Sequence, residues 1–173
     1  PGPTLGEEHL VNGWALDVVA YPKPVIAALN GTAYGVGVTM TLGCDVRYAA
    51  SSATLGLNFT TLGVLPGLGS THHLPQLVGI GKALELILSG AKVSAEDACA
   101  MGLVQRLCAP GEVYSEARNL ALAMAKVKPA VLAAARKALR QGATSTLAEA
   151  ITTEKALSRE LGSAEIQLSN ANI

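Results

Sequence analysis

Aromatic and charged side chains are both scarce in this sequence of 173 residues. Aromatic residues make up 3% of the chain and charged residues 15%, whereas half of all residues are hydrophobic. A chain of this length fits one domain or slightly more, and it has ample material for a core. The interior must therefore be built mainly from Ala, Val, Leu and Ile, with glycine allowing elements to approach closely.

The sequence has no excess of charge of either sign. Lys and Arg together number 13, as do Asp and Glu, so the formal net charge is zero at pH 7. A nucleic-acid-binding protein normally has a basic patch, and electrostatic attachment to a membrane needs a basic cluster. No apolar run reaches the roughly 20 residues that span a bilayer, and no signal-peptide pattern is present. We therefore expect neither nucleic acid nor a membrane among the partners.

Cysteine is rare as well. The three cysteines, Cys44, Cys99 and Cys108, lack the spacing of a metal site, and their number is odd. Such a set is typical of reduced, buried thiols in an intracellular protein. The sequence therefore predicts no metal site.

Short apolar segments alternate with turns in the first half of the chain. The apolar run Val25–Leu29 predicts a buried strand, and Gly35–Leu42 predicts a short helix. Two further strands are expected at Cys44–Ala50 and Ala53–Leu57, and an amphipathic helix is expected upstream, at Glu7–Ala20. The order of these segments predicts a parallel βαβ unit with a right-handed crossover.

Helical periodicity dominates the second half of the chain, after a loop at Asn58–Ser70. The predicted helices are Thr71–Val78, Lys82–Ser89, Ser94–Met101, Glu112–Lys126, Ala130–Gln141 and Thr146–Leu161. A short strand is expected at Leu103–Cys108. Ser94 and Asp97 have the spacing of a capping box, and Gly102 is suited to end that helix.

Three glycines, Gly31, Gly35 and Gly37, lie where the first strand passes into the short helix. Such a junction leaves backbone N–H groups without partners, and glycine removes the side chains that would block a ligand. It can bind an anion, or a carbonyl oxygen that becomes anionic during a reaction. The spacing matches neither the P-loop nor the dinucleotide-binding fingerprint. The structural alternative is that the glycines only let the helix pack closely on the sheet.

A second glycine-rich junction follows in "LGVLPGLGSTHHLPQLVG". Together with "KPVIAALNGTAYGVG", "CDVRYAASSATLG", "ALELILSG" and "SAEDACAMGLV", it resembles, in order, the crotonase or enoyl-CoA hydratase/isomerase superfamily. The resemblance covers residues 22 to about 137. It implies an α/β fold, a crotonase-like spiral of ββα units, with a core at residues 1–110. It also implies a C-terminal helical trimerisation region at residues 111–173, and hence a homotrimer or hexamer.

The resemblance implies an acyl-CoA thioester as the substrate, with no cofactor other than the coenzyme A that the substrate carries. In such proteins two backbone N–H groups donate to the thioester oxygen as enolate charge develops. One of these positions matches Val36, where the family usually has glycine. The other lies in an upstream segment that this sequence does not match. We therefore expect the N-terminal part of a longer chain to be missing; a degenerate family member is the alternative. The implied location is cytoplasmic, or mitochondrial or peroxisomal in a eukaryote.

The acids that the family uses for hydration have no match here. Two glutamates flank a water in hydratases, and their positions match Thr39 and Phe59, which cannot transfer that proton at neutral pH. The single acid of some isomerases matches Gly67. The resemblance thus implies a site that stabilises an enolate but has no side chain that acts as a general base. A decarboxylase would suit such a site, because loss of CO₂ forms the enolate directly; a non-catalytic acyl-CoA-binding homologue is the other alternative.

The implied pocket surrounds the two glycine-rich junctions. Its substrate-binding positions are Ala33, Tyr34, Gly35, Asn58, Leu62, Gly63, Pro66 and Gly67. His72 and His73 are the nearby imidazoles, with a pKa suited to acid–base work, although exposed helix-start residues are the structural alternative. Asp45, at the start of the second strand, is expected to hold the turn or a partner arginine, and Met40 and Met101 are expected to fill the core.

Overall fold

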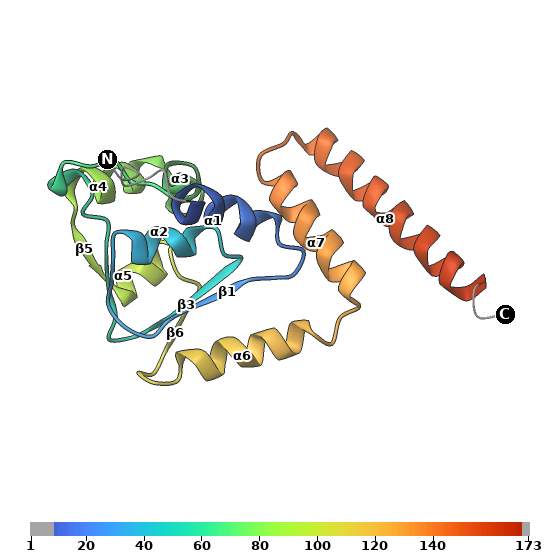
Figure 1. Ribbon diagram of the computed structural model, residues 1–173, viewed down its shortest axis with the longest axis horizontal. Helices are drawn as coiled ribbons and strands as arrows, with labels where there is room; N and C mark the ends of the chain where they lie inside the picture. The colour runs from blue at the N-terminus through green and yellow to red at the C-terminus, as the bar shows by residue number, and fades with distance from the viewer. Residues whose placement is uncertain (1–8, 171–173) are drawn as a thin grey trace. The chain divides into compact units, whose positions relative to one another are not determined.

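The computed structural model describes residues 9–170, with side chains for residues 13–163. The chain divides into two compact units. The described part of the first unit contains residues 9–21 and 25–121, and that of the second contains residues 22–24 and 122–170. Figure 1 shows the elements of each unit.

A three-stranded parallel sheet forms the base of the first unit. Its strands are β1 (Ile26–Leu29), β3 (Val46–Ala50) and β6 (Arg106–Cys108), in the order β1-β3-β6. The helix α2 (Val36–Leu42) lies between β1 and β3 in the chain, and its Val38 and Leu42 share one core with Leu29 of β1 and Ala49 of β3. The predicted parallel βαβ unit is therefore confirmed. The strand β3 is shorter than the predicted strand Cys44–Ala50, because Cys44 and Asp45 belong to the turn that precedes it.

A second small sheet has the order β2-β4-β5. Its strands are β2 (Ala33–Tyr34), β4 (Thr54–Gly56) and β5 (Lys92–Ser94). β2 pairs with β4 in parallel and β5 pairs with β4 in antiparallel orientation. The sequence did not predict β2 or β5, since strands of two or three residues are too short for a period-2 pattern.

Helices cover the sheets of the first unit. They are α1 (His9–Ala20), α3 (Ser70–Val78), α4 (Ile80–Ser89), α5 (Ala95–Ala100) and α6 (Val113–Met124), of which residues 113–121 belong to this unit. A 3₁₀ turn, η1, spans Thr60–Leu62. The first residues of the helix predicted at Glu7–Ala20 lie outside the described residues. The predicted cap is confirmed: the Ser94 Oγ accepts from the Asp97 N–H at 3.0 Å and donates to its carboxylate at 2.7 Å.

The main core of the first unit lies between these helices and the strands. Its fully buried side chains are aliphatic, as the composition predicts, with Phe59 as the aromatic exception. The members of this core are Leu29, Val38, Leu42, Ala49, Leu55, Leu57, Phe59, Leu74, Ala83, Leu86, Ala98, Leu103 and Val104. The core therefore directly supports α2 and the loop that follows β4.

The second unit is a helical hairpin of α7 (Pro129–Gly142) and α8 (Leu147–Asn170), which pack against each other. Leu157 is buried in this unit, whereas Leu139 and Leu147 are 76% and 78% exposed. Both helices were predicted, and α8 continues beyond the predicted end. No helix among the described residues has the length and hydropathy needed to cross a bilayer.

Candidate functional site

The turn between β2 and α2 depends on the backbone conformation of Gly35. Gly35 has φ 51° and ψ −118°, a region that residues with a Cβ rarely adopt. Its N–H donates to the Gly56 carbonyl at 2.9 Å, and its own carbonyl accepts from the N–H groups of Val38 and Thr39 at 3.0 Å. Gly35 thus ends the small sheet and begins α2 within one residue.

The N–H groups of Val36 and Gly37 remain available at this turn. Within the described residues, neither of these two groups donates a hydrogen bond to the protein. The Val36 side chain is 54% exposed, so this end of α2 is accessible from outside. A ligand oxygen can therefore accept a hydrogen bond from the backbone here without displacing a protein acceptor.

Phe59 and Asn58 lie next to Gly35. A Cβ added to Gly35 would come within 3.7 Å of the Phe59 Cζ and 3.8 Å of the Asn58 Oδ1. The Phe59 side chain is buried, and the Asn58 carboxamide makes no hydrogen bond to the described residues. The structure thus brings three sequence-predicted site residues together: Gly35, Asn58 and Phe59.

Thr39 lies one helical turn after Val36. Its side chain is 1% exposed, and its hydroxyl donates a long hydrogen bond of 3.5 Å to the Val36 carbonyl. The positions matched to the two hydratase acids, Thr39 and Phe59, are therefore both buried and contain no ionisable group. This end of α2 provides hydrogen-bond donors and an apolar wall, but these two positions supply no base.

Two threonines anchor the loop after β4. The Thr60 hydroxyl donates to the Ile87 carbonyl at 2.5 Å, and the Thr61 hydroxyl donates to the Asn58 carbonyl at 2.8 Å. These contacts tie the loop to α4 and to itself. Further along the loop, Leu62 and Gly63 are exposed, and Pro66 and Gly67 are half-buried. Nothing in these contacts places the last four positions against Val36.

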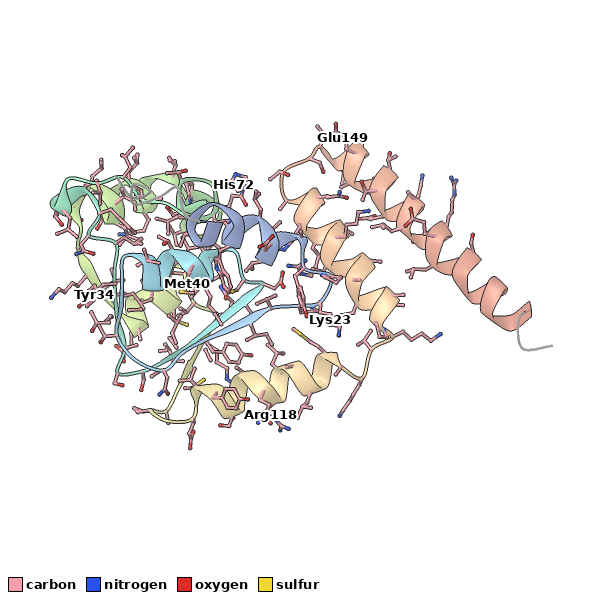
Figure 2. All side chains as sticks on the ribbon, in the orientation of Figure 1. Lys23, Tyr34, Met40, His72, Arg118 and Glu149 are labelled. Carbon is pink, nitrogen blue, oxygen red and sulfur yellow. The ribbon has the colours of Figure 1, made fainter. Side chains whose placement is uncertain are left out.

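The ring of Tyr34 packs over Gly56, its partner residue in the small sheet. Tyr34 pairs with Gly56, and a Cβ on Gly56 would lie 2.5 Å and 2.6 Å from two carbons of the Tyr34 ring. The Lys92 ammonium lies 5.5 Å from the centre of the same ring, close enough for a cation–π contact. Tyr34 is 39% exposed and Ala33 packs on the main core, so β2 faces both the interior and the surface (Figure 2).

His73 lies near the other end of α2, and His72 precedes it in α3. A Cβ on Gly43, the residue after α2, would be 3.7 Å from the His73 Nε2. His72 is exposed and contacts the Gln76 side chain at 3.0 Å. Since α2 is seven residues long, about 10 Å separates this end from Val36. This distance favours a structural role for the two histidines, as residues at the start of a helix, over acid–base work next to Val36.

Asp45 and Met40 had structural roles predicted from the sequence. The Asp45 Oδ2 accepts from the Val25 N–H at 2.7 Å, which confirms that it stabilises the turn before β3. The prediction for Met40 was wrong: its side chain is 37% exposed, as Figure 2 shows on α2. Met40 occupies the outer face of a short helix whose inner face consists of Val38, Thr39 and Leu42.

Arg47 is a residue that the sequence reasoning missed. It lies in the middle of β3 and is 2% exposed, which is rare for arginine. Its side chain donates to the carbonyls of Leu103 at 2.7 Å and Cys44 at 2.9 Å, among others. A single arginine inside the apolar strand "CDVRYAA" was the available signal, because a core strand accepts a charge only where it is fully hydrogen-bonded.

The chain resembles known proteins over most of its length. A family model described as enoyl-CoA hydratase/isomerase matches residues 4–170. YngF of Bacillus subtilis (strain 168) is 41% identical over 151 residues, which cover 87% of this chain and 58% of YngF. The mitochondrial enoyl-CoA hydratase domain-containing protein 2 of Homo sapiens is 38% identical over 148 residues, which cover 83% of this chain and 51% of that protein.

The fold has a close counterpart among solved structures. A Thermobifida fusca YX protein, crystallised in complex with acetoacetyl-CoA, superposes with a TM-score of 0.82 at 28% identity. The match covers 88% of this chain and 59% of that one. The chain thus spans between 51% and 59% of the length of these three proteins.

Proposed function

Because the chain belongs to the enoyl-CoA hydratase/isomerase family, we propose that the protein binds an acyl-CoA thioester and stabilises its enolate at the Val36 N–H. The observation that carries this proposal is the turn at Gly35, which leaves that N–H accessible next to Phe59 and Asn58. Acyl-CoA is the substrate class that the family name implies, and one structural relative was crystallised with acetoacetyl-CoA.

In this proposal the thioester carbonyl accepts a hydrogen bond from the Val36 backbone. The valine at this position does not prevent the interaction, because every residue except proline has the N–H. The hydrogen bond strengthens as negative charge moves onto the oxygen, so it favours the enolate over the neutral thioester. The buried ring of Phe59 next to Gly35 excludes water from one side of the site, which strengthens the interaction further.

The reaction that suits these residues best is decarboxylation of a 2-carboxyacyl thioester. The bond between C2 and the carboxylate breaks, CO₂ leaves, and the electron pair moves to the thioester oxygen to form the enolate. Water then protonates C2. No side chain has to remove a proton, which fits a site in which Thr39, Phe59 and Gly67 replace the family's acids. The carboxamide of Asn58, whose Oδ1 lies 3.8 Å from the position of a Gly35 Cβ, is a polar side chain next to this site.

The second candidate is a non-catalytic homologue that binds acyl-CoA. It is favoured by the same three replacements, because each lost proton-transfer group commonly lowers the rate by about 10²- to 10⁴-fold. The two candidates make the same prediction for binding and different predictions for turnover.

A panel of enoyl-, malonyl- and aryl-CoA esters separates the candidates. The enzyme proposal expects turnover of at least one ester by the full-length chain, with malonyl-type esters first. Binding by calorimetry with turnover at background supports the non-catalytic homologue. Absence of both binding and turnover with every ester contradicts both. A Thr39→Glu, Phe59→Glu double variant that gains hydratase activity indicates that only the acids were lost.

We also propose that the protein is a homotrimer or hexamer. The helical hairpin α7–α8 leaves large apolar side chains exposed, such as Leu139 and Leu147, and a two-helix unit buries little surface by itself. Sedimentation of the full-length chain as a monomer would contradict the proposal. The proposed location is the cytoplasm, or a mitochondrion or peroxisome in a eukaryote; the human relative is a mitochondrial protein by its name.

A further inference from the structure

Side chains from two other elements bind the last turn of α2. The Trp14 Nε1, from α1, donates to the Met40 carbonyl at 2.9 Å. The Arg47 Nη1, from β3, donates to the carbonyls of Thr41 and Leu42, each at 3.3 Å. The last carbonyls of a helix have no intrahelical donor, and these contacts supply donors to three of them. The Leu42 contact is buried, whereas the Thr41 carbonyl also accepts from the Cys44 N–H at 3.0 Å and the Met40 contact is exposed.

The guanidinium of Arg47 connects α2 to a second segment. Its Nε donates to the Leu103 carbonyl at 2.7 Å, and its Nη2 donates to the Gln105 Oε1 at 3.3 Å. Gln105 is itself positioned, because its Oε1 also accepts from the Arg47 N–H at 2.9 Å and its Nε2 donates to the Gly102 carbonyl at 2.9 Å. The planar, rigid donor group of Arg47 therefore joins α2, β3 and the segment before β6.

We infer that Arg47 is a positioning residue, which sets the place of the Val36 N–H by binding the opposite end of α2. This inference rests on the proposed function of Val36. A helix of seven residues moves as one body, so a shift at its last turn is passed to its first. Catalytic hydrogen bonds tolerate little displacement, and a shift of about 1 Å can reduce a rate on the order of 100-fold.

Acetoacetyl-CoA is the probe for this inference, because its acyl group ionises to an enolate with its own ultraviolet absorption. The fraction of bound ligand present as enolate, measured against pH, reports how well the N–H is placed. The affinity for coenzyme A without an acyl group reports binding alone. In Arg47→Met we expect the enolate to be disfavoured on the order of 10- to 100-fold, with the coenzyme A affinity unchanged. Arg47→Lys should rescue the effect in part, since lysine restores the charge without the planar fork.

Two variants serve as controls. Arg106→Met removes an arginine from the neighbouring strand β6, where it is exposed and pairs with Glu116 at 3.1 Å, and it should leave the enolate fraction unchanged. Trp14→Phe removes one donor to α2 while keeping an aromatic ring, so it should act in the same direction as Arg47→Met and less strongly. It keeps the inference testable if Arg47→Met does not fold.

Amide hydrogen exchange in the ligand-free protein completes the test. Arg47→Met and Trp14→Phe should speed exchange in α2, and Arg106→Met should not. An unchanged enolate fraction in folded Arg47 and Trp14 variants would overturn the inference, as would an equal loss of coenzyme A affinity and enolate. If the unmodified protein binds neither ligand, the proposed function fails. Exchange in α2 then decides the role of Arg47, and unchanged exchange overturns it.

Discussion

The ring of Phe59 lies against Gly35, with its Cζ 3.7 Å from the point where a Cβ of residue 35 would be. That distance is ordinary van der Waals contact, so space alone does not exclude alanine at this position. The backbone does, because φ is 51° and ψ is −118° at Gly35. The backbone conformation, and not the available space, therefore restricts residue 35 to glycine. Substitutions can separate these two effects.

Gly35→Ala should destabilise the protein by about 1–3 kcal/mol, the usual cost of a strained backbone conformation. Gly37→Ala is the matched control: Gly37 is helical and a Cβ there would lie 3.6 Å from the Ala33 Cβ, so the change should be neutral or slightly stabilising. Urea denaturation monitored by circular dichroism measures both. Equal stabilities of the two variants would show that the Gly35 conformation carries no strain.

Val36→Pro should weaken enolate stabilisation while leaving the fold intact. Proline is well tolerated at the first position of a helix, and its only necessary loss there is the N–H. Removing one such donor typically lowers kcat by about 10²- to 10³-fold. Val36→Ala keeps the N–H and should retain the activity. If both variants behave alike, in turnover or in the enolate fraction of bound acetoacetyl-CoA, the Val36 N–H is not the donor.

The Glu149 carboxylate should respond to the loss of its hydrogen bond from the Thr146 hydroxyl. The Thr146 N–H and hydroxyl both donate to it at 2.8 Å, and these bonds lower the pKa of Glu149. A lowered pKa in the folded state means that the contribution to stability is present above the usual glutamate pKa and is lost as the pH falls through the folded value. Thr146→Ala removes the hydroxyl and keeps the backbone N–H, which is the larger cause, so the pKa of Glu149 should rise only in part towards its usual range, measured by NMR titration. Thr144→Ala, just outside this contact, should leave it unchanged.

The Cys108 thiol should react more slowly than the Cys99 thiol. Burial raises the pKa of the Cys108 thiol, with Arg106 acting in the opposite direction. A raised pKa reduces the thiolate fraction at mildly alkaline pH, and the thiolate is the reactive form. Cys99 is half-buried, whereas Cys44 and Cys108 are buried. In a Cys44→Ala background, Cys108→Ala should therefore retain the faster phase of reaction with Ellman's reagent and lose the slower one. Loss of the faster phase instead would contradict the prediction.

The sequence predicted the elements that local patterns define. The apolar run at Val25–Leu29 and the cap at Ser94 are such cases, because periodicity and capping depend on neighbours along the chain. β2 and β5 escaped prediction, since each exists only through its pairing with β4. Arg47 escaped for the same reason: its acceptors at Leu103 and Gln105 are more than fifty positions away in the chain.

In the candidate site, too, the features that depend on local sequence were predicted, and those that depend on distant contacts were not. The glycine pattern predicted an accessible backbone at α2, and the structure places Asn58 and Phe59 beside it. The histidines could not be placed from the sequence, because their position relative to α2 depends on how α3 packs. Met40 was misplaced since a short apolar helix does not reveal which of its faces is covered.

Because of the contact between Tyr34 and Gly56, the residues that are tolerated at one of these positions depend on the residue at the other. The ring occupies the space of a Cβ at residue 56, so the Tyr34 ring must shift before any residue other than glycine is accepted there. Replacing Tyr34 with alanine would free that space, and Gly56→Ala, damaging alone, would then be accepted. In related sequences, substitutions at these two positions should therefore occur together. A side chain at position 56 should be found only after the residue at position 34 has changed.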